Sequence, residues 1–265
     1  MRFLIPVVVA LGLSAIALWR TDGFSPASIQ VPLLESKDLV SEEVSIPTSY
    51  RYLSRGRQAF VFESGDVVLK LFNVKDLQEP VAARFPRNSE RAKIRWAEKL
   101  RIYPESYRLA ATYLADQTGV LVVHLGQSEK RFPVVELVDK ASRRFQIDLN
   151  TVPFVIQKKG IGSFYQSLQS GRLDQMIDAF LSFHQKRIGL NIADHDRDIK
   201  RNYCWNGDSL QYIDPARFFY EPRLSDPERR KLEWWKATHR LRKWLVKHAP
   251  DRVESFDNKV NLLLL

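Results

Sequence analysis

The sequence predicts an α+β fold, with a sheet in the first half of the chain and mainly helices in the second. Three observations lead to this prediction. Short runs rich in β-branched and aromatic residues recur between residues 50 and 158. Apolar residues take helical spacing between residues 171 and 190, and a basic, Trp-containing segment after residue 225 has the pattern of a closing helix.

Length and composition limit the domain organisation, the class of binding partner and the kinds of cysteine site that are possible. A chain of 265 residues that is 45% hydrophobic can bury a core as one bilobal unit or two small domains. The formal net charge of +10 favours anionic partners such as nucleotides, phosphorylated glycans, anionic lipid or nucleic acid. The single cysteine, Cys204, excludes an intramolecular disulfide and a zinc site built from CxxC pairs.

The first twenty residues, MRFLIPVVVALGLSAIALWR, form an uncharged apolar run between Arg2 and Arg20. We interpret residues 1–20 as a membrane anchor that spans the bilayer through residues 3–19, or alternatively as a cleaved signal with an Ala15-Ile16-Ala17 site. Residues 21–48 are then a linker. These features predict attachment to a bacterial inner membrane. The charges that flank the apolar run favour a globular part outside the cytosol, whereas ATP is available in the cytosol. The side of the membrane on which the globular part lies therefore stays open.

Three antiparallel strands are expected from Tyr50, with a turn at Ser64-Gly65-Asp66. A long charged segment from Asn88 to Gly119 has helical spacing, and Pro104 is expected to divide it into two helices. Four more short strands follow, in the segments GVLVVHLG, FPVVELVDK, RRFQIDL and VPFVIQKKG.

The second half begins with a helix whose apolar face contains Leu173, Met176, Ile177, Phe180 and Leu181. Asn206-Gly207 between two apolar triplets predicts a hairpin. The capping-box pattern from Ser225 to Glu228 predicts the start of the last helix. Its many Lys and Arg residues and three Trp residues suit a half-buried closing helix, or contact with anionic lipid or a phosphorylated glycan.

The first predicted hairpin fits a phosphate-binding loop. In the template G-x-G-x-x-G-x-V followed by V-A-I-K, the segment 67–70 takes the lysine strand and places Lys70 at its end. Small residues replace two of the three glycines. The four positions of the loop template are occupied by Ser54, Gly56, Ala59 and Val61.

Polar residues downstream occur in a matching order. Phosphoryl transfer needs an aspartate that orients the hydroxyl nucleophile, an asparagine metal ligand, and a second metal-binding aspartate. Asp196, Asn202 and Asp214 follow an amphipathic helix in this order, with the Asn206-Gly207 hairpin between the last two.

On these motifs the chain resembles the protein-kinase-like superfamily from Tyr50 to about Phe219, and more closely its small bacterial sugar- and lipopolysaccharide-kinase-like members. The resemblance implies a two-lobed fold, with an antiparallel-sheet N-lobe over residues 49–157 and a shortened, mainly helical C-lobe over residues 158–265. It implies ATP and Mg²⁺ as cofactors and a hinge at residues 154–158. The resemblance also implies roles for individual residues. The implied catalytic residues are Asp196 and Lys70, with Asp198 as an alternative base, and the implied metal ligands are Asn202 and Asp214. The implied nucleotide-binding residues are Ser54, Gly56, Ala59, Val61, Lys70, Glu105 and Gln157.

Some positions depart from the family pattern. In the family, the catalytic aspartate lies five residues before the asparagine. Here Asp196 lies six residues before Asn202 and Asp198 lies four residues before it, and Asp194 is a third candidate for the base. Glu105 is favoured over Glu90 and Glu98 as the partner of the lysine.

Three functions therefore remain open. The first is a phosphotransferase acting on the hydroxyl of a glycan, lipid or small molecule rather than of a protein, because only 51 residues (265 − 214) follow Asp214 and no A-P-E sequence is present. The second is a catalytically inactive pseudokinase or nucleotide-binding module. The third is a membrane-tethered adaptor that uses its basic surface. Nucleic acid is not expected as a partner, because no recognised binding module occurs.

Overall fold

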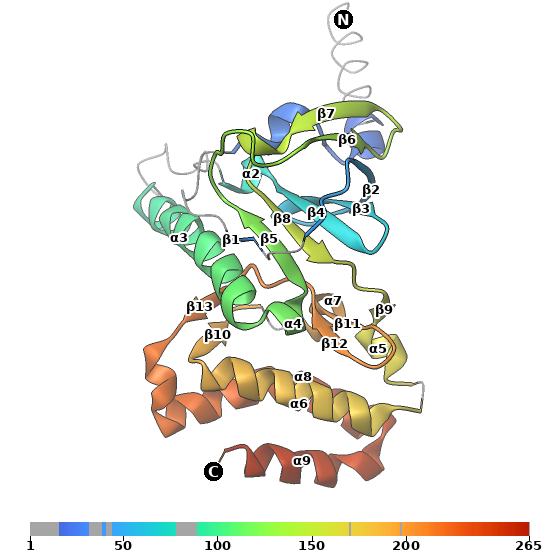
Figure 1. Ribbon diagram of the computed structural model, residues 1–265. Helices are drawn as coiled ribbons and strands as arrows, with labels where there is room; N and C mark the ends of the chain where they lie inside the picture. The colour runs from blue at the N-terminus through green and yellow to red at the C-terminus, as the bar shows by residue number, and fades with distance from the viewer. Residues whose placement is uncertain are drawn as a thin grey trace, which may run out of the picture. The chain divides into compact units, whose positions relative to one another are not determined.

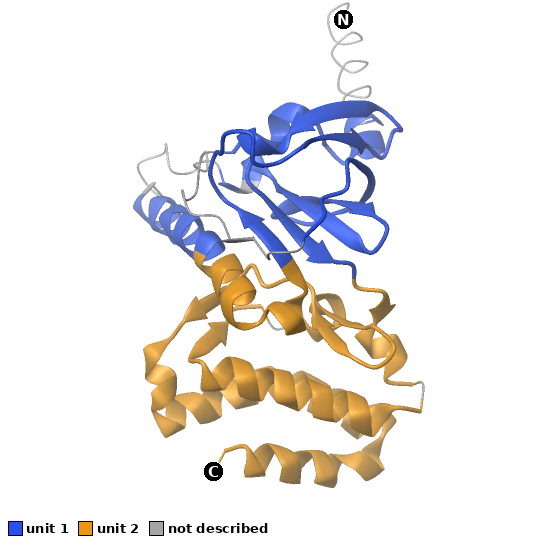
Figure 2. Ribbon diagram, viewed as in Figure 1, with its two compact units in different colours: residues 1–104, 121–159 blue, residues 105–120, 160–265 orange. Residues whose placement is uncertain are grey.

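The structure is a computed structural model, and it describes residues 16–31, 39–40, 44–77, 89–169, 171–196 and 198–264. The elements of the chain are labelled in Figure 1, and Figure 2 shows its division into two compact units. Unit 1 contains Met1–Pro104 and Leu121–Lys159, and unit 2 contains Glu105–Val120 and Gly160–Leu265. Both strands and helices are present, which confirms the predicted α+β class.

Unit 1 is built on an eight-stranded sheet with the strand order β1-β5-β8-β4-β3-β2-β6-β7. The strands β2, β3 and β4 form consecutive antiparallel pairs, as predicted, and β8 pairs with β4. However, β6 pairs with β2 in parallel, so the sheet is mixed rather than purely antiparallel. A long connection precedes β6, and no tight hairpin forces its direction. The strands are β1 Leu39–Val40, β2 Ser49–Arg55, β3 Ala59–Ser64, β4 Val67–Phe72, β5 Val120–His124, β6 Val134–Val138, β7 Arg144–Asp148 and β8 Phe154–Lys158.

One face of this sheet packs into the core of unit 1. Side chains alternate between the two faces of a strand, so Leu69 and Leu71 of β4 lie on one face and Lys70 on the other. Leu69 and Leu71 are fully buried, and Phe60 and Phe62 of β3 lie opposite them in the register. The β4 strand therefore separates an apolar core face from the face that presents Lys70.

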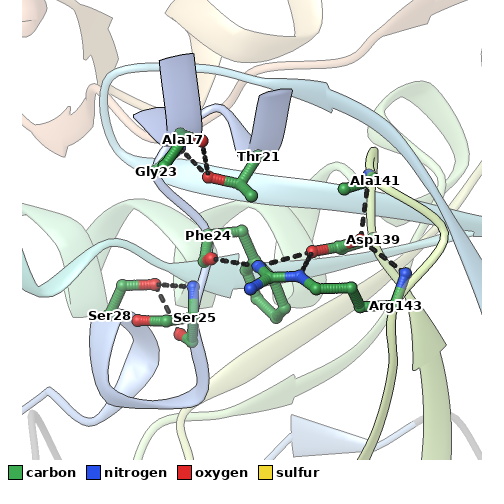
Figure 3. A network of polar contacts seen from close by, with 9 residues as sticks. All are labelled: Ala17, Thr21, Gly23, Phe24, Ser25, Ser28, Asp139, Ala141 and Arg143. Atoms are coloured by element: carbon green, nitrogen blue, oxygen red, sulfur yellow. Dashed lines mark hydrogen bonds and ion pairs between the residues drawn. The ribbon is translucent and has the colours of Figure 1, made fainter. Parts of the chain in front are cut away.

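The segment after the predicted anchor packs on unit 1, although residues 21–48 were expected to form a linker. Phe24 and Ile29 are almost completely buried in the core, and the short 3₁₀ helix η1 spans Pro26–Ile29. Polar contacts close around it (Figure 3): the Arg143 guanidinium donates to the Phe24 carbonyl at 3.3 Å and pairs with Asp139 at 2.7 Å. Burial of the apolar side chains of Phe24 and Ile29 stabilises the folded form of this segment.

Helix α3, Ser89–Tyr113, runs through Pro104 as one helix, so the prediction that this proline divides it was wrong. A proline inside a helix removes one hydrogen bond and strains the preceding turn, and tertiary contacts can offset that cost. Here the residues just after Pro104 are held from outside the helix. Ser106 Oγ donates to the Phe218 carbonyl at 2.6 Å, and Glu105 accepts from the Tyr220 amide at 2.9 Å.

Unit 2 is mainly helical and carries two small sheets. The predicted amphipathic helix is α6, Leu173–Gly189, and its predicted face is confirmed, because Met176, Ile177, Phe180 and Leu181 are buried. One sheet pairs β10 with β13; the other has the order β12-β11-β9. The remaining elements are α2 Val74–Leu77 of unit 1 and, in unit 2, α4 Ala115–Thr118, β9 Gly162–Ser163, α5 Phe164–Ser167, β10 Ile192–Asp194, α7 Ile199–Asn202, β11 Tyr203–Trp205, β12 Leu210–Tyr212, β13 Phe218–Tyr220, α8 Pro227–His248 and α9 Val253–Leu262.

The predicted hairpin is formed by β11 and β12, and its turn is closed by a hydrogen bond from the Asn206 amide to the Ser209 carbonyl at 2.9 Å. Gly207 supplies the positive φ, +90°, that the turn requires. On the other side of β11 the chain passes very close. A Cβ at Gly160 would lie 2.5 Å from Sγ of the buried Cys204, so only glycine fits there.

The last part of the chain contains two helices rather than the single one expected. Helix α8 starts one residue later than the capping-box pattern suggested, because Asp226, not Ser225, is the N-cap and accepts from the Glu228 and Arg229 amides. Helix α9 follows it, with Phe256 buried.

The predicted membrane anchor falls mostly outside the described residues, which begin at residue 16. Residues 16–21 are helical, and Trp19 is 73% exposed. Within the part of the chain that the structure describes, no helix is both long enough and apolar enough to span a bilayer. The anchor therefore stays a prediction.

Candidate functional site

The predicted nucleotide-binding residues of unit 1 share one row across the sheet. Ser54 lies opposite Val61, Val61 opposite Lys70, and Lys70 opposite Val155, on four neighbouring strands. Residues directly opposite each other in antiparallel strands point to the same face. A β-bulge between Tyr52 and Ser54 brings Ser54 into this row. This face is the one turned away from the apolar core.

Other predicted residues lie on the same face of the sheet. Val68 precedes Lys70 by two residues, and Gln157 of β8 lies opposite Val68. Ala59 begins β3 two residues before Val61. Lys70 is half-buried, whereas Gln157 is 1% exposed. The face therefore combines small and apolar side chains with polar ones, which include Lys70, Gln157 and, opposite Val68, Glu63.

Gly56 lies in the turn between β2 and β3. Its amide donates to the Ala59 carbonyl at 2.9 Å, and the Asn73 amide donates to the Gln58 carbonyl at 2.7 Å, so the turn is tied to the end of β4. A Cβ at Gly56 would have its nearest neighbour, the Ala59 carbonyl oxygen, at 3.7 Å, which is an ordinary contact. Packing within the protein therefore does not require glycine at this position.

The structure places Glu105 in unit 2, where its carboxylate accepts from the Tyr220 amide at 2.9 Å and so holds the end of β13. Its predicted pairing with Lys70 would join residues of different units and stays a prediction. The alternatives Glu90 and Glu98 are exposed on the first half of α3.

Three aspartates in unit 2 form a series of turns. The Asp194 carboxylate accepts from the Asp196 amide at 2.7 Å, the Asp196 carboxylate from the Asp198 amide at 3.0 Å, and the Asp198 carboxylate from the Lys200 amide at 3.1 Å. Such turns are the usual local use of aspartate. The last of these bonds caps α7, and Asp198 also pairs with Arg201 at 3.5 Å. The Asp198 carboxylate therefore makes more local structural contacts than the Asp196 carboxylate.

The predicted metal ligands are brought to the same end of the β11–β12 hairpin. The Ile213 amide donates to the Asn202 carbonyl at 2.7 Å, so Asn202 and Asp214 leave the hairpin on neighbouring strands. Among the described residues, no group of three His, Cys, Asp or Glu side chains could hold a metal ion. A site here would therefore consist of one amide and one carboxylate, which leaves most coordination positions to a ligand.

A buried network of charged and polar groups lies beside these residues. Arg187 of α6 and Glu233 of α8 form an ion pair at 2.9 Å, with side chains 1% and 6% exposed. Arg187 also donates to the Ile192 carbonyl at 2.6 Å. Glu233 accepts from the Asp194 amide at 3.3 Å. The pair therefore links both long helices to strand β10.

The environment of this network shifts the pKa values of several of its groups, including Asp194 and His184. Burial raises the pKa of the Asp194 carboxyl from 3.8 to about 7, against the opposing charge of Arg187. Burial and the same arginine lower the pKa of His184 well below its usual value, so its imidazole is neutral. Because Arg187 can only donate, His184 Nδ1 accepts from it at 3.3 Å, and Nε2 donates to the Tyr203 hydroxyl at 3.0 Å.

Sequence reasoning missed most of this network, and Asp194 was only its third candidate base. A signal was available for one member. Arg187 falls four residues after Phe183 and seven after Phe180, on the apolar face of α6. A charged residue at such a position requires a buried partner. The sequence did not show that this partner is Glu233.

No family model matches this chain, and no curated protein matches it. Among solved structures, the chain is similar to the ROP18 kinase domain in complex with AMP-PNP and sucrose, with 14% sequence identity and a TM-score of 0.36. The match covers 64% of this chain and 51% of that domain, so the chain spans about half its length. A TM-score this low does not establish a shared fold.

Proposed function

We propose that the protein is a phosphotransferase of the protein-kinase-like type that binds Mg·ATP. The row formed by Ser54, Val61 and Lys70 on one face of unit 1 is the observation that carries the proposal. In protein kinases the phosphate-binding lysine lies on the third strand, after the glycine-rich loop. Lys70 is on the third strand of the β2-β3-β4 series, and the Gly56 turn joins the first two.

Each residue would have a defined task. Mg·ATP would supply the transferable phosphoryl group. Lys70 would bind phosphate oxygens, and the open surroundings of Gly56 would allow backbone amides to approach them. Val61 and Val68, on the same face, would contact the base. In unit 2, Asn202 and Asp214 would hold Mg²⁺ through an amide and a carboxylate oxygen.

Asp196 is the proposed base. It would orient the acceptor hydroxyl and accept its proton, because the carboxylate of Asp198 is engaged as a helix cap and ion-pair partner. We propose a glycan, lipid or small-molecule hydroxyl as acceptor and the predicted anchor as the membrane attachment. The basic face of α8 would suit an anionic lipid or a phosphorylated glycan.

A nucleotide-binding protein without turnover is the second candidate. The observation in its favour is the series of aspartate turns, in which Asp194, Asp196 and Asp198 each use a carboxylate oxygen to accept a local backbone amide. Such bonds stabilise the loop and compete with a catalytic use of the same oxygens.

Thermal unfolding with and without Mg·ATP tests binding. We expect the melting temperature of the wild type to rise with millimolar Mg·ATP, because a ligand that binds only the folded state stabilises it. Lys70→Met should abolish the rise, whereas Lys75→Met, which removes an exposed lysine of α2, should keep it. The absence of any rise in the wild type would contradict the proposal.

ATP turnover then separates the two candidates. Asp196→Asn should retain the Mg·ATP-dependent rise in melting temperature but lose at least about 100-fold in turnover, as expected on removal of a general base. Asp198→Asn should reduce stability with a smaller effect on turnover. A wild type that shows the Mg·ATP-dependent rise in melting temperature but no turnover would favour the nucleotide-binding protein, and turnover that survives both Asp196→Asn and Asp214→Asn would contradict the proposed phosphotransferase.

A further inference from the structure

The carboxylate of Asp194 bonds to two different parts of the proposed catalytic machinery. Its Oδ1 accepts from the Asp196 backbone amide at 2.7 Å. Its Oδ2 accepts from the Tyr212 hydroxyl, also at 2.7 Å. The N–H···O distance is short for its type, and the O–H···O distance is an ordinary one.

Tyr212 continues this chain of contacts to the proposed metal ligand. A tyrosine hydroxyl has one hydrogen, which Tyr212 gives to Asp194, so its oxygen is left as an acceptor. The Asn202 side-chain amide donates to that oxygen at 3.4 Å, a long contact. With Nδ2 directed at Tyr212, the carbonyl oxygen of the Asn202 side chain is directed elsewhere. A metal ligand needs this orientation.

The tyrosine ring is fixed by its neighbours in unit 2. It stacks on Phe183 with a centroid distance of 5.3 Å and on Phe218 at 5.0 Å. Tyr212 is 1% exposed. The hydroxyl therefore stays beside Asp194, and its other acceptor within reach, at a longer 3.3 Å, is the carbonyl of Asp196 in the same loop.

Asp194 is itself held from three directions. Strand β10 pairs with β13, and Asp194 lies opposite Phe218. The Asp194 amide donates to Glu233 at 3.3 Å, and Glu233 is fixed by Arg187. Asp194 is 4% exposed, so water has little access to these contacts.

We propose that Asp194 is a positioning residue for the transfer reaction: it fixes the backbone of the base Asp196 directly and orients the metal ligand Asn202 through the Tyr212 hydroxyl. The inference rests on the proposed function and adds to it a residue that contacts neither substrate nor metal. Partners of metal ligands that act in this way usually contribute about 10–100-fold to metal affinity or activity.

The test compares two tyrosines. Tyr212→Phe removes the hydroxyl that links Asp194 to Asn202 and keeps the ring. Tyr203→Phe is the matched control, because its hydroxyl is equally buried in the same aromatic cluster but bonds to His184. Mg²⁺ is titrated into each variant in the presence of ATP, and ATP alone is titrated without metal.

We expect Tyr212→Phe to weaken Mg²⁺ binding in the ATP complex about 10-fold, with unchanged affinity for metal-free ATP. Tyr203→Phe should leave Mg²⁺ binding within about 2-fold of the wild type, although it lowers stability by removing the partner of His184 Nε2. Equal effects of the two substitutions, or no effect of either, would overturn the proposed orientation of Asn202.

A second measurement does not depend on activity. Asp194→Ala removes both acceptor oxygens, so it loses both bonds. Amide hydrogen exchange at Asp196, followed by NMR, should become faster in this variant. Unchanged exchange overturns the positioning role. If the wild type binds no Mg·ATP, the proposed function fails, and exchange at Asp196 still decides whether Asp194 fixes this loop.

Discussion

Two arginine–carboxylate pairs, one in each unit, have almost the same length and very different surroundings. In unit 2, Arg187 and Glu233 are 2.9 Å apart with side chains 1% and 6% exposed. In unit 1, Arg143 and Asp139 are 2.7 Å apart, but Arg143 is 50% exposed. The distance between the charges therefore does not distinguish the two pairs, whereas burial does.

The pairs also differ in what remains when the arginine is removed. The Asp139 carboxylate accepts from the Ala141 and Arg143 amides, both at 2.9 Å, so its charge would keep backbone partners. Glu233 would keep only the Asp194 amide at 3.3 Å. A buried charge without partners costs several kcal/mol. We therefore expect the buried pair to control the stability of unit 2, and the exposed pair to adjust only the packing of residues 21–31.

The largest effect is expected from Arg187→Met. It leaves Glu233 and Asp194 buried beside each other without a cation, and should lower the free energy of unfolding by about 4 kcal/mol. Urea unfolding of the wild type and the variant measures this change in the free energy of unfolding. Arg201→Met, which removes an 83% exposed arginine from the pair with Asp198, is the control and should cost less than about 0.5 kcal/mol.

The double variant Arg187→Met/Glu233→Gln identifies the cause. Glutamine removes the unpaired charge and can still accept from the Asp194 amide. Most of the lost stability should return, because a buried pair replaced as a whole costs little. A double variant as unstable as Arg187→Met would show that packing, rather than charge, explains the loss.

The next largest effect concerns the N-terminal segment of unit 1. Phe24 makes edge-on contacts with Phe60, Phe62 and Phe145, at centroid distances between 4.9 and 5.7 Å. Phe24→Ala should lower the free energy of unfolding by about 3 kcal/mol through the cavity it leaves. Trp19→Ala, at a 73% exposed position, should leave unfolding nearly unchanged. If Phe24→Ala changes the free energy of unfolding as little as Trp19→Ala does, residues 21–31 add little to the core.

Much of this fold could be predicted from local pattern. The alternation in β3 and β4 and the helical spacing in α6 each bury one face, and the strand register then determines that Ser54, Val61 and Lys70 share a row. One local rule failed. Pro104 lies inside α3, because contacts at Glu105 and Ser106 outweigh its helix-breaking effect.

The candidate site was less predictable than the fold. The order of Asp196, Asn202 and Asp214 along the chain indicated a family, and the hairpin brings the last two together. The buried network depends on pairs that no local pattern relates, such as Arg187 and Glu233, 46 residues apart (233 − 187). Only the position of Arg187 on an apolar face indicated that such a partner exists.

The pH dependence of stability provides a test within the buried network. The folded pKa of Asp194, about 7, lies above its ordinary value of 3.8, so the folded state holds an extra proton between these values. The contribution of Asp194 to the free energy of unfolding should therefore fall as pH rises from about 4 to about 7, by on the order of 1 kcal/mol per pH unit, whereas His184, whose pKa is lowered, contributes in the opposite direction below its ordinary pKa of 6.5. The charged and titratable groups around Asp194 are His184, Arg187, Asp196, Tyr203, Tyr212 and Glu233.

Urea unfolding of the wild type and of Asp194→Asn at pH 5, 6, 7 and 8 measures this difference. The variant has no carboxyl at this position, and its stability should decline less steeply between pH 5 and pH 7. Parallel curves for the two proteins would show that Asp194 does not take up a proton in this range.

The smallest effect is expected at the exposed pair. Arg143→Ala should lower the free energy of unfolding by about 0.5 kcal/mol, because Asp139 keeps its backbone donors and the arginine is half exposed. It also removes the bond to the Phe24 carbonyl, so amide exchange in residues 24–31 should become faster. Arg144→Ala, which breaks a pair with Glu136 on the same β6–β7 hairpin, should leave that exchange unchanged. Equal exchange in both variants would mean that Phe24 and Ile29 hold this segment without help from the polar contacts.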